Sequence, residues 1–580
     1  MTFPFSTVIR VEQVLSLASF AYLTGYLVTR VPVVWCFWQA RPRLLAEWAF
    51  WLVVAFIVRA WLPPDFIHAN LHGYDLLEDV LRFPAPGGYR PTQGQGVPAV
   101  AGLLCWLTGG GWRTFTLINS LANVGTVATT AILARRLGGD WAARFVLAMG
   151  ATFPLLVRVA ASEDGHNLAC LFASIGLVLA DSARTETTPR LGRLVAVGSS
   201  LILAVESRQS LLPWCVVILA VVAQRPVGVW LRRPAVWSAM ALSTLALVPK
   251  VSFLLADGSD VRQALLLVQS VVLVISPVTW THHSLFLPET ALFLWGGAVL
   301  GAWRAWRARD RLGLTLAIAI QFWFLGTIAM SWHPSAGVEA FRLPLLVLLL
   351  PLSGSGMAGL LESAGRRWAL NARRVGLLGL SVMVIVTASP IGLLVAMAKT
   401  REPQTQEYEV ISTHASSLPH DATILVSPMP SDGAMHYVPP YSAFGRDYKH
   451  VETWPGHPGL SSGPRYFYQG LDCFLHPLTT LLGTDVQRLI ARIKALDLTQ
   501  LLDLHRLIWD DPAGAIALWG GNIPKGMRPE CAAIIAEVRG AVFEPWGEVH
   551  VSRHELPHWF AAQMVIPIGV WRLPEAEVER

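Results

Sequence analysis

The chain alternates long apolar runs with short polar loops through its first 400 residues. Runs close to the roughly 20 residues that cross a bilayer predict membrane-spanning helices, about twelve in all. The pattern therefore predicts a polytopic α-helical membrane protein. The expected spans are 11–40, 46–62, 113–133, 142–160, 167–182, 194–207, 210–224, 236–254, 285–302, 312–330, 343–361 and 375–398.

Two further apolar segments, 97–109 and 263–277, do not fit as crossings. Counting either as a span would place the next basic loop on the wrong side of the membrane. Both are short enough to be interfacial or re-entrant helices on the outer face, and we expect them there.

Composition excludes a soluble protein, because 53% of the residues are hydrophobic and only 14% are charged. The net charge of +6 is unevenly divided: residues 1–399 hold 31 basic and 18 acidic residues, whereas residues 400–580 hold 14 and 21. Positive charge in short loops marks the cytoplasmic side of an inner (plasma) membrane, so no nucleic-acid partner is expected. Six loops carry it: Arg41 and Arg43; Arg135, Arg136 and Arg144; Arg184, Arg190 and Arg193; Arg225, Arg232 and Arg233; Arg304, Arg307, Arg309 and Arg311; Arg366, Arg367, Arg373 and Arg374.

Three regions follow from these patterns. Residues 1–43 contain a retained extra transmembrane helix, because the run lacks a small-residue cleavage site. Residues 44–398 form the main transmembrane domain, with a long outer loop at 63–112. After Lys399, helical and strand-like patterns alternate, which predicts a soluble extracytoplasmic α/β domain over 399–580. Its two cysteines, Cys473 and Cys531, could pair in an oxidising compartment.

The outer loop 63–112 carries the first group of candidate residues. Asp75, Glu78 and Asp79 have i, i+3, i+4 spacing, so on a helix they share one face and could converge on one cation or one hydroxyl. The alternative is an ordinary acidic face on a solvated interfacial helix.

A second acidic group lies between two expected spans. Glu163, Asp164 and His166 fall in a loop so short that all three side chains must lie at the bilayer edge. Ionisable groups are costly there and are functional candidates for that reason. A hydrated polar turn is the alternative.

The order of motifs resembles the C-type glycosyltransferase (GT-C) superfamily, in its branch of protein mannosyltransferases and aminoarabinose transferases. An acidic outer loop is followed by "YRPTQGQGVPAVAGLL" and by a span ending in "ARRLGG". Pro154, Arg158, Ser162 and Glu163 come next, then "AVESRQSLLPWCVVIL" and "EAFRLPLLVLLLPLSGSGMAGL". The chain departs from the pattern where Tyr74 precedes Asp75, so the three loop acids remain alternatives.

The resemblance implies an enzyme that moves a sugar from a polyprenyl-phosphate-linked donor to a lipid, glycan or protein acceptor on the outer face. Such a reaction needs a base for the acceptor hydroxyl and positive charge for the departing phosphate. We expect Asp75 as the base, with Glu78 and Asp79 as alternates, and Glu163 or Asp164 as an assisting acceptor or a second metal ligand.

The expected donor-binding residues lie at outer helix ends. The planar guanidinium groups of Arg208 and Arg342 can each make two parallel hydrogen bonds to phosphate oxygens. The alternative is that these side chains snorkel to the membrane interface. His166, His282 and His333 are the remaining substrate-binding candidates, the last two beside tryptophans. No cofactor is certain, and a divalent metal ion stays open. Membrane lipid is the other expected partner.

Two other classes of function compete with this interpretation. A transporter or flippase for a lipid-linked glycan would show inverted repeats with charges at mid-membrane depth, and the sequence has neither. A non-catalytic membrane scaffold makes no prediction about the acids. Whether Asp75 or its neighbours, Glu163 and Arg342 face a common cavity discriminates between these alternatives.

Overall fold

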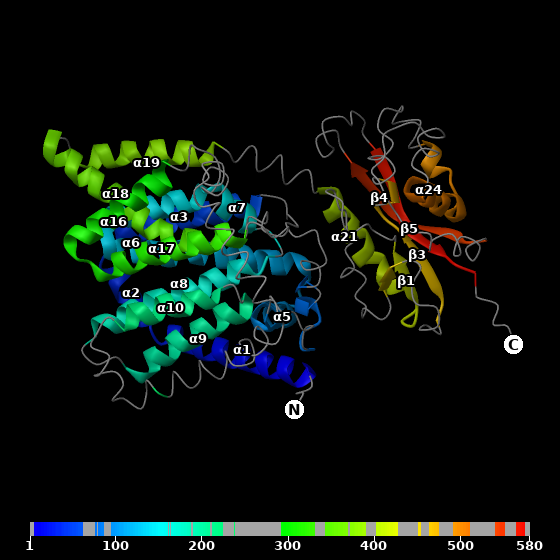
Figure 1. Ribbon diagram of the computed structural model, residues 1–580, viewed down its shortest axis with the longest axis horizontal. Helices are drawn as coiled ribbons and strands as arrows, with labels where there is room; N and C mark the ends of the chain where they lie inside the picture. The colour runs from blue at the N-terminus through cyan, green and yellow to red at the C-terminus, as the bar shows by residue number, and fades with distance from the viewer. Residues whose placement is uncertain are drawn as a thin grey trace. The chain divides into compact units, whose positions relative to one another are not determined.

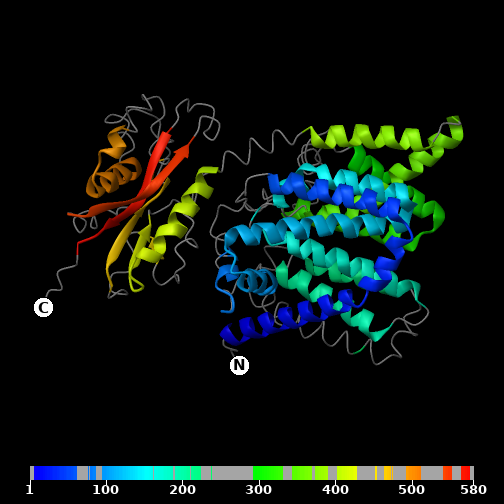
Figure 2. The same ribbon diagram turned by 180° about the vertical axis from the view of Figure 1, so that it is seen from behind.

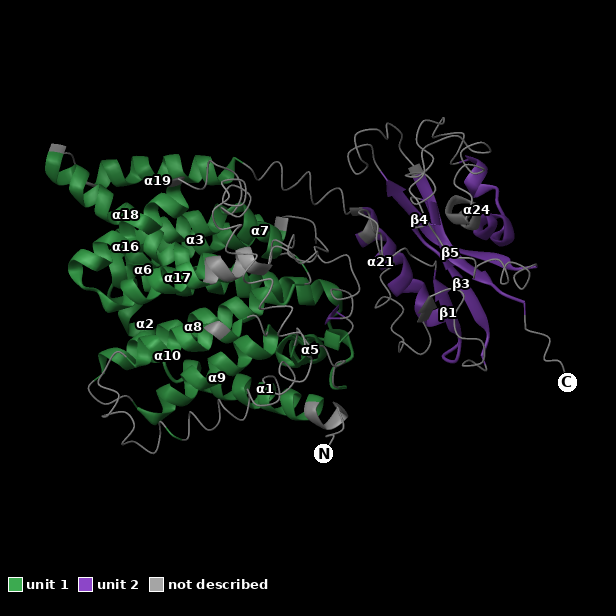
Figure 3. Cartoon of the chain, viewed as in Figure 1, with its two compact units in different colours: residues 1–63, 79–395 green, residues 64–78, 396–580 purple. Residues whose placement is uncertain are grey.

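The structure is a computed structural model. It describes residues 5–61, 76–77, 79–85, 94–160, 162, 164–186, 190–208, 211–223, 237, 292–330, 343–368, 372–389, 402–426, 451–453, 463–471, 473–474, 491–510, 540–551 and 564–574. The chain divides into two compact units, residues 1–63 with 79–395 and residues 64–78 with 396–580 (Figure 3).

The first unit is a bundle of apolar helices (Figure 1). Four helical segments in the described part of the chain are long and apolar enough to cross a membrane: Ile9–Gln39, Trp112–Thr152, His166–Thr185 and Leu343–Arg367. The helices are α1 (Phe5–Val28), α2 (Val31–Gln39), α3 (Pro42–Trp61), α5 (Gly96–Thr108), α6 (Trp112–Thr152), α7 (Pro154–Ala160), α8 (His166–Thr185), α9 (Leu191–Ser207), α10 (Leu212–Val222), the π-helix η2 (Leu292–Gly296), α16 (Gly297–Ala308), α17 (Arg311–Met330), α18 (Leu343–Trp368) and α19 (Ala372–Ala388).

Within the described residues, the helices overlap the expected apolar runs, but two of these runs are divided. The run expected as one span at 142–160 is shared between the second part of α6 and α7, which begins at Pro154. The run expected as one span at 11–40 is two helices, α1 and α2, because Pro32 opens the second and cannot continue the hydrogen bonding of the first. The helix α6 is two helices joined at Gly139, as expected from the arginines beside it. The runs at 236–254 and 263–277 lie outside the described residues.

Small residues let the helices around α6 approach closely. A β-carbon on Gly354 of α18 would lie 2.6 Å from the carbonyl oxygen of Ala142 in α6. A β-carbon on Gly356 would likewise collide with the backbone of Gly297 in α16. Since lipid tails are as apolar as leucine, such close packing is a main source of helix association in a membrane.

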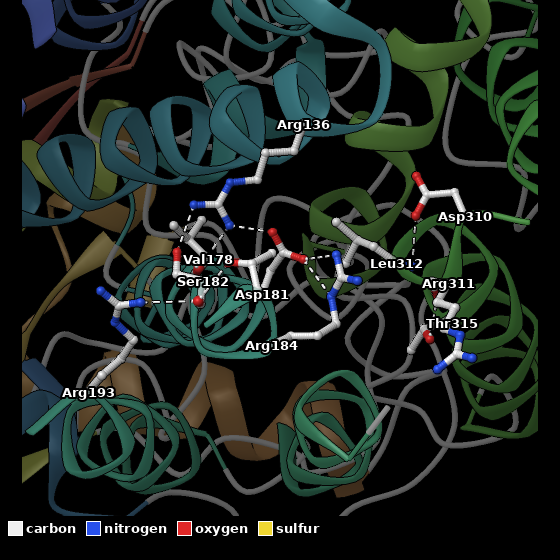
Figure 4. A network of polar contacts seen from close by, with 11 residues as sticks. Arg136, Val178, Asp181, Ser182, Arg184, Arg193, Asp310, Arg311, Leu312 and Thr315 are labelled. Carbon is white, nitrogen blue, oxygen red and sulfur yellow. Dashed lines mark hydrogen bonds and ion pairs between the residues drawn. The ribbon is translucent and has the colours of Figure 1, made fainter. Parts of the chain in front are cut away.

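Ionic side chains gather at the end of the bundle where α8 finishes. Asp181 accepts hydrogen bonds from Arg136 and from Arg184, whose Nη2 atom lies 2.8 Å from the carboxylate. Arg193 pairs with Glu186 at 2.7 Å. Figure 4 shows Arg136 and Arg184 pointing to Asp181, and Arg193 pointing to Ser182. Arginines from two of the expected cytoplasmic loops thus meet at one end of the bundle.

The second unit contains a five-stranded sheet of order β2-β1-β3-β5-β4. Strand β1 is parallel to β2 and β3, whereas β5 is antiparallel to β3 and β4. The buried carboxylate of Glu407 accepts hydrogen bonds from the Tyr468 hydroxyl at 2.7 Å and from the Leu471 amide at 3.0 Å, which ties a helix to the sheet. The elements are α21 (Glu402–His414), β1 (Thr423–Val426), β2 (Val451–Thr453), β3 (Arg465–Gln469), α24 (Leu498–Asp510), β4 (Val542–Val551) and β5 (Met564–Arg572).

The structure describes one of the two cysteines of this region. Cys473 is buried in the second unit, and Cys531 lies outside the described residues. Their pairing therefore stays a prediction.

The glycine at the junction inside α6 provides a test of the fold. Gly139 has φ 76° and ψ −166°, a conformation that is essentially restricted to glycine, and a β-carbon there would meet no atom within 4 Å. Gly139→Ala should therefore lower the free energy of unfolding through backbone strain alone, by about 1–3 kcal/mol. Unfolding in detergent, followed by tryptophan fluorescence, measures this.

Gly25→Ala is the matched control. A β-carbon on Gly25 also has open space, but the residue has ordinary helical geometry inside α1. This substitution should stabilise the protein by up to about 1 kcal/mol. Equal effects of the two substitutions would show that Gly139 is not a strained junction.

Candidate functional site

The structure describes four of the ten candidate residues. Asp79, Asp164, His166 and Arg208 are all buried. The other six lie outside the described residues: Asp75, Glu78, Glu163, His282, His333 and Arg342.

Asp164, His166 and Arg208 form one buried cluster at the beginning of α8. The Oδ1 atom of Asp164 accepts hydrogen bonds from the backbone amide of His166 and pairs with its ring Nδ1, both at 2.7 Å. The Nη2 atom of Arg208, which directly follows α9, lies 3.4 Å from the same oxygen. One carboxylate thus fixes the imidazole and holds the guanidinium next to it.

The turn that carries this carboxylate is held in place by polar residues of α6. Asn119 donates to the carbonyl of Ser162 at 2.8 Å, and Ser120 donates to the carbonyl of Ala160 at 3.1 Å. Asn167 adds hydrogen bonds from α8 to the carbonyls of Val159 and Asp164. Unsatisfied backbone groups are costly when buried, so these side chains make an irregular buried turn tolerable.

A buried arginine connects the turn to the rest of the bundle. Arg59, which has no exposed surface, donates to the Oδ1 atom of Asn123 at 3.0 Å and to the carbonyls of Gly150 and Ala151. Asn123 in turn donates to Asn167 at 2.9 Å. The chain Arg59–Asn123–Asn167 therefore joins α3, both parts of α6 and α8.

Sequence reasoning missed this chain of hydrogen bonds. Its signal was the presence of an arginine and several asparagines inside apolar runs, where polar residues are expensive and need a partner. Arg59, Asn123 and Asn167 were not among the candidate residues, because none of them lies in an expected outer loop.

A second carboxylate near Arg208 was also overlooked. Glu206 is buried at the end of α9, and its Oε2 atom accepts the backbone N–H of Gln95 at 3.2 Å. This places a negative charge at the N-terminus of α5, where the helix dipole favours it. A β-carbon on Gly96 would lie 2.6 Å from the Ser207 nitrogen, so α5 and α9 meet without space for a side chain.

Asp79 belongs to the segment that packs on the other side of α5. A β-carbon on Gly102 of α5 would lie 2.9 Å from the carbonyl oxygen of Val80, directly after Asp79. Gln13 of α1 donates to the carbonyl of Pro84 at 3.3 Å. The segment 79–85 is therefore held between α1 and α5, and its acid is buried with it.

The cluster can orient an imidazole and present a guanidinium. Donation of the Nδ1 proton of His166 to Asp164 sets the ring tautomer, and Nε2 is then the acceptor nitrogen. A guanidinium forms charge-assisted hydrogen bonds to phosphate oxygens, and these are stronger than the hydrogen bonds of a neutral donor. Within the described part of the chain, no group of three or more histidine, cysteine or acidic side chains is arranged to hold a metal ion.

No family model matches the sequence, and no curated protein matches it. The structure is similar to the crystal structure of ArnT from Cupriavidus metallidurans in the apo state. The TM-score is 0.50 at 15% identity, over 77% of this chain and 96% of ArnT. The likeness establishes a shared fold.

Two other solved structures are also similar. ArnT from Cupriavidus metallidurans bound to undecaprenyl phosphate has a TM-score of 0.49 at 15% identity, over 77% of this chain and 97% of that chain. The oligosaccharyltransferase from Archaeoglobus fulgidus in the apo form has a TM-score of 0.48 at 12% identity, over 92% of this chain and 77% of that chain.

The hydrogen-bond chain beneath the cluster yields a prediction. Asn123→Ala removes the acceptor of Arg59 Nε and the donor to Asn167, and leaves buried polar groups without partners. It should lower the free energy of unfolding by about 1–3 kcal/mol. Detergent unfolding of the purified protein measures the loss.

Thr126→Ala, one turn further along α6, is the control. Thr126 is also buried, but its hydroxyl donates only to Ala122 of its own helix, at 3.0 Å. Loss of this hydroxyl should lower the free energy of unfolding by at most about 1 kcal/mol. If both substitutions lower the free energy of unfolding by the same amount, the interhelical hydrogen bonds of Asn123 contribute nothing beyond packing.

Proposed function

We propose that the chain is an integral-membrane glycosyltransferase that takes a sugar from a polyprenyl-phosphate-linked donor. The acceptor is a lipid, a glycan or a protein on the outer face. The observation that carries the proposal is the buried Asp164–His166–Arg208 cluster, on a fold shared with ArnT. The donor class comes from the GT-C resemblance of the sequence motifs.

The reaction needs one bond formed and one broken at the anomeric carbon of the sugar. The acceptor oxygen bonds to this carbon while the bond to the donor phosphate breaks and its electron pair leaves with the polyprenyl phosphate. A carboxylate takes the proton of the acceptor hydroxyl. We assign this role to Asp75, with Glu78 and Asp79 as alternates.

The arginines stabilise the leaving group. Negative charge develops on the bridging phosphate oxygen, and a guanidinium fixed beforehand lowers the free energy of that state. Asp164 holds Arg208 in place for this role. Arg342, which directly precedes α18 in the sequence, is assigned the same role. Asp164 acts by orienting Arg208 and His166, and Glu163 assists as an acceptor for sugar or acceptor hydroxyls. His166, His282 and His333 contact the substrate in this proposal.

Burial supports the chemistry, because water would hydrolyse the activated sugar. A site at the membrane boundary also lets the lipid tail of the donor stay in the bilayer while the phosphate reaches the arginines. A divalent metal ion would need Asp79 or Asp164 together with acids outside the described residues, and the proposed steps do not require one.

The proposed topology has about twelve crossings in an inner (plasma) membrane, with the arginine-rich loops in the cytoplasm. The helix α8 has 20 residues, about 30 Å of helix, and separates the Asp164 cluster from the Asp181 cluster. The Asp164 cluster then lies at the outer boundary. Residues 1–43 form an added N-terminal element, 44–398 the catalytic domain and 399–580 an extracytoplasmic domain that binds or gates the acceptor.

Substitution of Arg208 tests the proposal. Arg208→Lys keeps the charge but loses the two-pronged geometry, and Arg208→Ala loses both. In proteoliposomes supplied with a polyprenyl-phosphate sugar, the donor concentration for half-maximal transfer should rise modestly for lysine. For alanine it should rise roughly tenfold to hundredfold, the equivalent of one hydrogen bond to a charged group.

Arg113→Ala provides the control, because Arg113 is an exposed arginine that stacks on Trp112 at the start of α6. Its donor dependence should equal that of the unchanged protein. Unchanged donor dependence in Arg208→Ala would remove Arg208 from the site and leave the phosphate to Arg342.

A further inference from the structure

The helix α1 crosses the whole bundle before α2 begins. In its first half, Gln13 contacts the segment 79–85 beside α5, at the end that holds the Asp164 cluster. Near its finish, Tyr22 donates to the carbonyl of Gly192 at 3.2 Å, and Tyr26 accepts from Arg193 at 3.1 Å. With 24 residues, α1 is about 36 Å long and exceeds the roughly 30 Å of a hydrocarbon core.

The helix α3 starts from the same arginine-rich end and runs back. Glu47, in its second turn, pairs with Arg144 at 2.8 Å, whereas Arg59, in its last turn, reaches Asn123 beneath the Asp164 cluster. The nine residues of α2 must therefore connect two crossings at one face, and they are too short to span. Figures 1 and 2 show α2 joining α1 to α3 at this end of the bundle.

The surface of α2 is apolar and exposed. No residue of the helix is buried, and Val31, Val33, Val34 and Trp35 are 58%, 65%, 50% and 54% exposed. Only Phe37 and Trp38 are partly covered by the bundle, Trp38 with its ring centroid 5.2 Å from that of Trp48. An apolar helix that lies across one end of a membrane bundle is stable where it enters the lipid interface.

Positive charge surrounds this apolar surface. The guanidinium carbons of Arg41 and Arg135 lie 4.6 and 4.9 Å from the centroid of Phe37. Arg135 is paired with Asp140, but within the described part of the chain Arg30, Arg41 and Arg43 have no carboxylate partner. An exposed apolar helix flanked by uncompensated arginines is complementary to lipids with negatively charged headgroups.

We propose that α2 is an interfacial helix that binds anionic phospholipids of the cytoplasmic leaflet. Val33, Val34 and Trp35 lie among the acyl chains at the headgroup boundary, and Arg30, Arg41 and Arg43 bind the headgroup phosphates. The site fixes the N-terminal helix α1 against the bundle. It is independent of the proposed transferase reaction, because α1 separates it from the Asp164 cluster.

The depth of α2 in the membrane is the first test. Cys36 lies on α2 and is exposed, so it accepts a nitroxide label once the other five of the six cysteines are replaced by alanine. Oxygen and nickel-chelate accessibility in proteoliposomes should place the label about 5–10 Å into the headgroup and acyl boundary. A label at the bilayer centre, or one fully in water, would overturn the proposal.

Lipid selectivity is the second test. A fluorophore on Cys36 is followed in nanodiscs of phosphatidylcholine that contain increasing amounts of phosphatidylglycerol. The signal should saturate with phosphatidylglycerol, and the Arg41→Gln/Arg43→Gln variant should need at least roughly tenfold more of it. Arg307→Gln/Arg309→Gln removes two exposed arginines from another loop and should behave as the unchanged protein.

Three outcomes contradict the proposal. If the signal ignores phosphatidylglycerol, or if both double variants weaken it equally, α2 has no specific role in lipid binding. If inorganic phosphate in solution produces the same change as the lipid, the arginines bind phosphate without a membrane and the lipid assignment is wrong.

Discussion

The fully buried side chain of Arg59 fixes the geometry on which the first unit depends. A fully buried guanidinium must place its N–H groups on acceptors within the protein, because no water is available to replace them. Arg59 finds them on Ala55, Asn123, Gly150 and Ala151. These hydrogen bonds hold α3 and both parts of α6 in place relative to each other. Through Asn123, it also sets the position of α8.

Two clusters of charged side chains lie near the two ends of α8. At one end, the carboxylate of Asp164 holds Arg208 and His166 in a buried cluster, to which we assign the donor phosphate. At the other end, Asp181 bridges arginines from neighbouring helices. The first cluster is buried and built from few charges, whereas the second is partly exposed and surrounded by further arginines. In the proposed topology, the Asp181 cluster faces the cytoplasm and the Asp164 cluster faces the outer side.

The apolar runs of the sequence predicted most of the helices that the structure describes in the first unit. They also placed Asp164, His166 and Arg208 at helix ends, but not in contact, because the hydrogen bond of Arg208 to Asp164 joins segments 44 residues apart. The break between α1 and α2 has a local cause in Pro32, which an apolar run does not reveal. The pairing of Glu206 with the start of α5 depends on a contact between distant segments, which periodicity does not encode. Asp75, Glu78, Glu163, His282, His333 and Arg342 lie outside the described residues, so their roles stay predictions.

The pool of polyprenyl-phosphate-linked sugars in cells that lack this protein tests the central claim most directly. If the chain consumes such a donor, one lipid-linked sugar should accumulate in the deletion strain. The unchanged gene should restore the normal amount, and the gene carrying Arg208→Ala should not. A lipid-linked sugar pool identical in cells with and without the protein would contradict the assignment as a glycosyltransferase.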